Sequence, residues 1–104
     1  MRKRRYEMLL PPKYNDGRPV GDDKFYQTRS DLVAQFGSLT LEPTFVRGTW
    51  THEGAQYEDE LIRITVDVED TSENHRFFLD FKIALLERFE QIDIYLVSHS
   101  VDVL

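Results

Sequence analysis

Apolar and polar residues alternate along several stretches of the chain, and strict alternation predicts a β-strand with one buried face. The pattern is clearest after residue 57, where Ile62 and Ile64 fall on one face and Arg63 falls on the other. A short turn containing Gly54 separates this stretch from the one before it, so the two together predict a hairpin. The predicted strands span residues 6–10, 39–51, 57–68 and 92–103.

Two further stretches carry apolar residues at helical spacing. The first begins near Asp22, which we expect to cap the helix, and it stops at Gly37, where a left-handed C-cap is expected. The second begins at Asp70, and Glu73 three residues later is typical of a capping box. The apolar positions are Phe25, Leu32, Val33 and Phe36 in the first helix, and Phe77, Phe78, Phe81, Ala84, Leu85 and Phe89 in the second.

The order of these elements is β-α-β-β-α-β, which is typical of the ferredoxin-like fold. We therefore expect an α+β sandwich, in which a four-stranded antiparallel sheet carries both helices on one face. Right-handed crossovers place the first and third strands at the centre of that sheet. Pro43 interrupts the second strand, which predicts a bulge or a sheet edge at that point. With 104 residues, the chain is expected to form a single domain over residues 1–104.

Charge refines this picture. The net charge of −6, from 19 acidic and 13 basic residues, argues against nucleic acid as a partner. Residues 1–5 are nevertheless strongly basic, and we interpret them as a solubilising, partly frayed N-terminal segment, or alternatively as a tail for an anionic partner. No stretch is apolar enough to span a membrane or to act as a secretory signal, and the chain has no cysteine. The expected compartment is therefore the cytoplasm.

Motifs for bound groups are missing from the sequence. It has no glycine-rich phosphate or dinucleotide motif, and its three histidines do not lie at metal-ligand spacing, so we expect no cofactor and no metal site. Glu58, Asp59 and Glu60 form an acidic triplet, with Glu58 and Glu60 on one strand face. A solvated surface is the expected role, and a carboxylate pair for acid/base chemistry is the alternative. Glu60 would need a cationic partner if it were buried among its apolar neighbours.

Several short motifs resemble those of small bacterial proteins of unassigned function that share this layout. They are Tyr6 with Glu7, Gly48 with Thr49 and Trp50, Gly54, the run Tyr57, Glu58, Asp59 and Glu60, and Arg88 with Phe89. The resemblance implies the same ferredoxin-like arrangement and assigns no catalytic role to any residue. The layout also resembles that of dimeric α+β barrels, a likeness of architecture that does not fix function.

Helices on one face leave the other face of the sheet uncovered, and we call this the open face. It is expected to be partly apolar, and such a surface typically marks an interface. The leading hypothesis is a non-catalytic homo-oligomer, with a dimer favoured, that associates through the open face or an edge strand and can also present its loops to another protein. The expected interface residues are Leu9, Leu61, Thr65, Val97 and Trp50.

The alternative hypothesis is a small cofactor-free enzyme of the dimeric-barrel kind, acting on a small organic molecule in a cleft on the same face. Its candidate catalytic residues are Glu7, Arg63, Tyr95 and His99, with His99 as the base and Arg63 as the anion binder. RNA is a third use of an open sheet face, but the acidic third strand argues against it. The long loop over residues 11–21 remains open as a lid, a partner-binding segment or an ordinary surface excursion.

Overall fold

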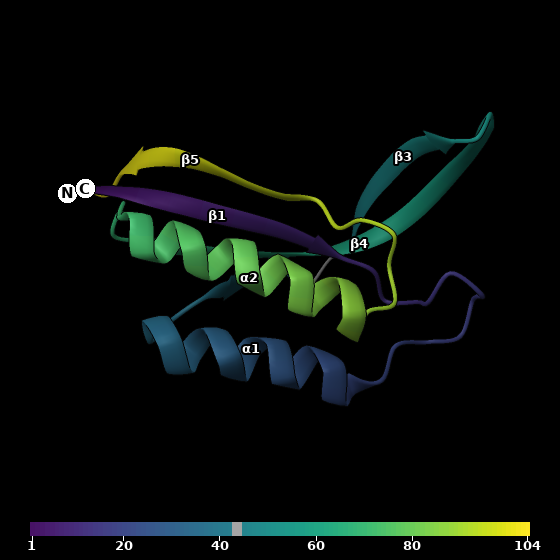
Figure 1. Cartoon of the computed structure of the whole chain (residues 1–104), viewed down its shortest axis with the longest axis horizontal. Coiled ribbons are helices and arrows are strands. Elements are labelled where there is room, and N and C mark those ends of the chain that lie inside the picture. Colours follow the sequence, from purple (N-terminus) through teal and green to yellow (C-terminus); the bar gives the residue numbers. More distant parts are fainter. Residues whose placement is uncertain (43–44) are drawn as a thin grey trace.

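A computed structural model describes residues 1–42 and 45–104 of the chain. Over these ranges, five strands and two helices follow one another along the sequence (Figure 1). They are β1 (Arg2–Leu10), α1 (Asp22–Phe36), β2 (Thr40–Leu41), β3 (Val46–His52), β4 (Ala55–Val68), α2 (Ser72–Arg88) and β5 (Leu96–Asp102). The predicted effect of Pro43 falls outside the described residues.

The sheet is antiparallel, with strand order β2-β4-β1-β5, and β3 pairs with the outer part of β4. This confirms the ferredoxin-like α+β fold and the central position of the first and third predicted strands. The prediction of four strands was wrong. The predicted second strand is two strands, β2 and β3, which pair with different parts of β4: Thr40 lies opposite Thr65, whereas Val46 lies opposite Leu61.

Both helices cover the same face of the sheet, and the core lies between the two layers (Figure 1). Tyr6 on β1 stacks against Phe78 on α2, with ring centroids 3.9 Å apart. Arg88 joins the two helices by donating hydrogen bonds to Thr28 and Asp31. Neither helix in the described ranges is long and apolar enough to cross a membrane. The buried apolar core comprises Tyr6, Met8, Leu10, Val20, Leu32, Ile64, Val66, Val68, Phe78, Phe81, Leu85, Phe89 and Ile94.

The helix caps confirm the predictions from the sequence only in part. Gly37 takes the expected left-handed conformation, with φ of 83°, at the end of α1. Neither predicted aspartate cap forms, because Gly21 occupies the cap position of α1 and Thr71 caps α2 by accepting a hydrogen bond from the Asn74 backbone N–H. Asp70 instead pairs with an arginine of β1.

The basic N-terminal segment is part of the sheet, so the interpretation of a frayed terminus was wrong. Residues 2–5 belong to β1 and pair with both β4 and β5. Arg4 donates a hydrogen bond to Asp70, and Arg5 donates two to the carboxylate of Asp67. Aspartates on the neighbouring segments therefore neutralise these cations, which a reading of the N-terminal segment alone does not anticipate.

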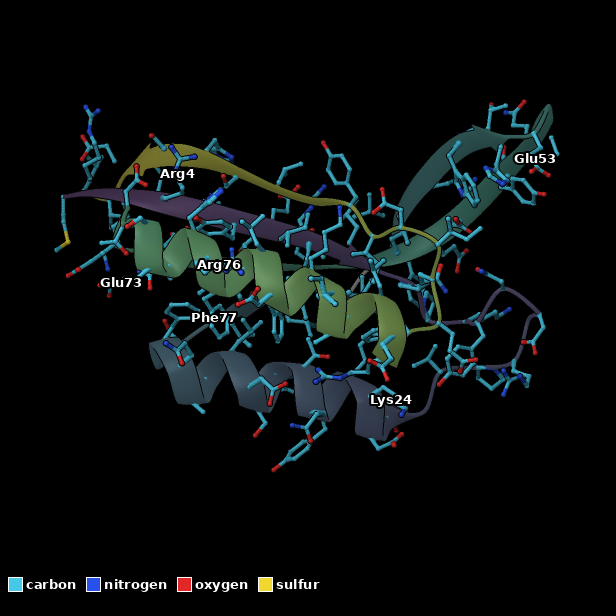
Figure 2. All side chains as sticks on the ribbon, viewed as in Figure 1. Arg4, Lys24, Glu53, Glu73, Arg76 and Phe77 are labelled. Carbon is cyan, nitrogen blue, oxygen red and sulfur yellow. The ribbon has the colours of Figure 1, made fainter. Side chains whose placement is uncertain are left out.

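Beyond the helices, β3 and residues 55–61 of β4 continue as a two-stranded ribbon, which we call the arm (Figure 1). Its tip is the predicted turn, where Glu53 and Gly54 both have positive φ, 50° and 80°. Figure 2 shows Glu53 at the tip of the arm, away from the two helices. Within the described residues, the buried core contains no side chain from the arm.

Candidate functional site

A cleft of about 580 Å³ lies between the arm and two loops, and an adjoining hollow adds about 330 Å³. We call the two together the arm cleft. One loop follows β1, and the other, residues 89–95, connects α2 to β5. The residues common to both parts are Pro11, Asn15, Trp50, Asp59, Gln91 and Ile92.

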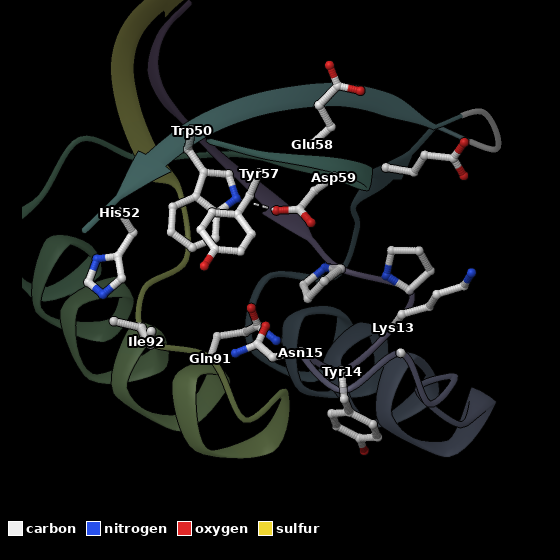
Figure 3. Close-up of a pocket in the computed structure, with 14 residues that line it drawn as sticks. Lys13, Tyr14, Asn15, Trp50, His52, Tyr57, Glu58, Asp59, Gln91 and Ile92 are labelled. Atoms are coloured by element: carbon white, nitrogen blue, oxygen red, sulfur yellow. Dashed lines mark hydrogen bonds between the residues drawn. The ribbon is translucent and has the colours of Figure 1, made fainter. Parts of the chain in front are cut away.

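The arm supplies an aromatic wall to this cleft. Strand register places Trp50 opposite Tyr57, and their rings stack with centroids 4.7 Å apart (Figure 3). The indole N–H of Trp50 donates a hydrogen bond of 2.6 Å to the carboxylate of Asp59. This bond fixes the plane of the indole and holds the Asp59 carboxylate beside it.

The opposite wall comes from the loops. The loop after β1 is held by backbone hydrogen bonds, from Tyr14 to Arg18 and from Val20 to Pro12, and the side chain of Val20 is buried in the core. Asn15 and Gln91 face the arm across the cleft in Figure 3. The long loop predicted over residues 11–21 therefore lines a cleft. Alternation and helical spacing in the sequence could not indicate this role.

Asp59 and its acidic neighbours lie on different faces of the arm, as alternation predicts. Figure 3 shows Asp59 directed toward the cleft and Glu58 directed away from it. Glu60 is exposed and therefore needs no cationic partner, although it shares its strand face with Ile62 in the sequence pattern.

On the open face, Arg63 lies between two carboxylates. It donates a hydrogen bond of 3.0 Å to Glu42, and its buried Nε lies 3.4 Å from Glu7 without forming a hydrogen bond. These carboxylates raise the pKa of the Arg63 guanidinium above its ordinary value, Glu42 by its hydrogen bond and Glu7 by its charge. Glu42 was not singled out from the sequence, because β2 is only two residues long and offers no pattern.

The four predicted catalytic residues lie in three places. Glu7 and Arg63 form the pair just described. Tyr95 lines the smaller part of the arm cleft, and its backbone carbonyl accepts a hydrogen bond from Leu9. His99 is exposed and lies opposite Arg5 in the β1–β5 register, further along the sheet.

The five predicted interface residues are divided in a similar way. Leu9, Leu61 and Trp50 line the arm cleft. Thr65 and Val97 lie opposite Glu7 on its two neighbouring strands and are half-buried. Among residues 1–42 and 45–104, no three His, Asp or Glu side chains converge in a way that could hold a metal ion.

No protein-family model matches the chain, and no curated protein matches it. Solved structures do share its fold. The divalent cation tolerance protein CutA1 from Thermus thermophilus superposes with a TM-score of 0.65 at 12% identity, covering 99% of this chain and 86% of that one. CutA1 from Ehrlichia chaffeensis gives 0.64 at 8% identity, covering 100% and 86%.

A phage SAM lyase, solved in complex with S-methyl-5'-thioadenosine, is similar to the same extent. Its TM-score is 0.64 at 12% identity, and the match covers 97% of this chain and 90% of that one. A cation tolerance protein and a SAM lyase share this architecture, so the likeness concerns the fold and not a common activity. This chain is thus a small α+β protein of the ferredoxin-like fold, similar in architecture to CutA1 proteins and to a phage SAM lyase.

Proposed function

We propose that this chain is a non-catalytic interaction module whose partner is a second copy of the same chain. The observation that supports this most directly is the arm, which extends past both helices (Figure 1). A two-stranded ribbon is marginally stable in water by itself. Trp50 and Tyr57 are 41% and 44% exposed on the arm, so a further strand and its side chains would supply packing that one copy lacks.

The outer edge of β3 suits such an addition. Exposed sheet edges are usually protected by lysine, proline or a bulge, because their free backbone groups can pair with another chain. The seven residues of β3 include no lysine and no proline, and Arg47 is their one permanently charged residue. On the open face, by contrast, Arg63 is already paired with both Glu7 and Glu42.

The turn at the tip shows which backbone groups of β3 point outward. A two-residue turn with both φ values positive closes a hairpin whose flanking residues, His52 and Ala55, bond to each other. Hydrogen-bonded and non-hydrogen-bonded pairs then alternate along the ribbon. Trp50 therefore bonds to β4, whereas the N–H groups of Arg47, Thr49 and Thr51 are directed to the free edge.

A twofold axis through Thr49 gives a favourable antiparallel register between two copies of β3. Arg47 then lies opposite Thr51 of the other copy, so no like charges face each other. Trp50 lies opposite Gly48 of the other copy, and an aromatic side chain over a glycine is a stabilising cross-strand arrangement. Gly48 has little room for a side chain of its own, because a Cβ there would lie 3.1 Å from Leu61.

Thr49→Pro tests this assembly. Proline removes the outward N–H at the centre of the proposed interface and leaves the bonds between β3 and β4 intact. Two hydrogen bonds are lost per dimer, so the dissociation constant should rise at least about tenfold. Sedimentation velocity over a concentration series measures this change directly.

Thr49→Val is the matched control, because valine keeps the N–H and the β-branched shape. It should sediment like the unmodified protein. If the unmodified chain is a monomer throughout the series, or if both variants dissociate equally, the proposed edge pairing is wrong. Circular dichroism confirms that each variant keeps its secondary structure.

A further inference from the structure

The arm cleft has the dimensions of a small-molecule site. Its larger part, about 580 Å³, lies within the range of roughly 300–1,000 Å³ that is typical of ligand pockets. The arm, the loop after β1 and residues 91–95 bound it, and all three belong to one chain. The cleft is therefore complete in a single copy and does not depend on self-association.

The aromatic wall gives this cleft a chemical preference. Trp50 and Tyr57 present stacked rings, and both are substantially exposed to solvent. The face of an aromatic ring carries partial negative charge and attracts cations, with tryptophan the strongest of the side chains in this respect. Because Asp59 holds the indole N–H, the Trp50 ring is fixed in place before any ligand arrives.

The charges around the cleft also favour a cationic ligand. Glu58, Asp59 and Glu60 are among the residues that line the larger part of the cleft, and Asp59 directs its carboxylate into it, whereas Glu58 points away. Lys13 is the one permanently charged cation among the residues that line this part. None of these four side chains forms an ion pair with another described residue within 4.0 Å. The uncompensated negative charge attracts a cation and repels a phosphate or a carboxylate ligand.

From these observations we infer that the arm cleft binds a small organic cation with a methylated ammonium head. The head lies against the rings of Trp50 and Tyr57, beside the carboxylate of Asp59. Asn15 and Gln91, on the opposite wall, offer amide groups for a polar substituent such as a hydroxyl. Methylated ammonium groups suit this wall better than a primary amine, because their weaker hydration favours contact with aromatic rings.

Titration with choline chloride tests this inference, followed by the fluorescence of Trp50, the one tryptophan of the chain. Sodium chloride at the same concentration controls for ionic strength. The neutral isostere 3,3-dimethyl-1-butanol has the same shape without the charge. A saturable change with choline, and a clearly weaker one with the isostere, is the expected result.

Three variants locate the site. Asp59→Asn keeps an oxygen that can accept the Trp50 hydrogen bond but removes the charge, and it should weaken choline binding about fivefold or more. Glu60→Gln removes the same charge from a position one residue further along the arm and should change the affinity less than twofold, by about the amount expected of a screened surface charge. Tyr57→Leu removes the aromatic ring from the wall and should weaken choline binding several-fold.

The inference fails if choline and its neutral isostere produce the same change, or if choline produces no saturable change. It also fails if Asp59→Asn and Glu60→Gln weaken binding equally, since that would indicate a diffuse field and not a site. Circular dichroism is recorded for every variant. Because Asp59→Asn and Glu60→Gln are both nearly isosteric, they decide the question without large disturbance of the arm.

Discussion

Charged side chains on the open face are arranged as neighbours that neutralise one another. Arg5 donates two hydrogen bonds, of 2.7 and 2.9 Å, to the carboxylate of Asp67 on the adjacent strand. A bidentate pair of this kind is stronger than an ordinary surface ion pair, because its geometry is fixed and both groups are partly shielded from water. The open face, whose sequence mixes polar and apolar residues, therefore has most of its charges paired.

This pair makes stability depend on pH. The hydrogen bond from Arg5 lowers the pKa of the Asp67 carboxyl below its ordinary value of 3.8. The folded state therefore binds this proton less readily than the unfolded state does, so the stabilisation is present above the ordinary pKa and is lost as the pH falls through the lowered one.

Asp67→Asn should lower the free energy of unfolding by about 1 kcal/mol at neutral pH. The difference from the unmodified protein should shrink as the pH falls below the ordinary carboxyl pKa. Urea denaturation at a series of pH values measures both quantities. Glu58→Gln, which removes a carboxylate without removing an ion pair to a described residue, is the matched control. A difference that stays constant over the whole pH series would contradict this account.

At the scale of elements, periodicity in the sequence was enough to locate both helices, the central strands and the turn at Gly54. Those features depend on local spacing, and each is confirmed. The division of the predicted second strand into β2 and β3 was not predictable, because it depends on which part of β4 each segment pairs with. The last strand begins at Leu96 and not at residue 92, since Ile92 is exposed and Asp93 is bound to Lys82 of α2.

The candidate site was less predictable than the fold for the same reason. Trp50, Leu61 and Tyr95 were singled out from the sequence, and they do line the arm cleft. Asn15 and Gln91 were not, because loop residues show no periodicity that indicates which side of the molecule they face. Alternation indicated only that Asp59 and Glu58 differ in direction, not that one of them faces a cleft.

The second helix provides most of the aromatic core, and its contribution can be measured. Phe81→Ala should lower the free energy of unfolding by about 3–5 kcal/mol, because the Phe81 side chain is only 6% exposed. Leu79→Ala, two residues earlier on the same helix, is the matched control and should cost less than about 1 kcal/mol, since Leu79 is 49% exposed. Urea denaturation compares the two. Similar losses in both variants would contradict the assigned orientation of α2.

At the scale of the whole molecule, two parts differ in how they are stabilised. The described buried core lies in the part covered by helices, whereas the arm is held by strand pairing and the Trp50–Tyr57 contact. The Val46–Leu61 pair stands an even number of residues before the His52–Ala55 pair, so the two pairs are of the same hydrogen-bonding type. The arm can therefore be shortened without changing strand register.

Replacing residues 47–60 with the two residues Glu-Gly should move the tip turn to Val46 and Leu61 and leave the core intact. We expect cooperative unfolding with a free energy within about 1 kcal/mol of the full chain, because no core residue is removed. Self-association should be lost together with the β3 edge. Urea denaturation and sedimentation velocity measure the two effects. Loss of cooperative unfolding would show that the arm is required for the fold.

One strand, β4, belongs to both parts: its first seven residues build the arm, and the remainder pairs with β1 and β2 beneath the helices. Because the strand is continuous through Ile62, a partner or ligand that holds the arm would also restrict local opening of the central strands. Binding at the arm should therefore slow hydrogen exchange of the most protected backbone amides, with no change in the average structure.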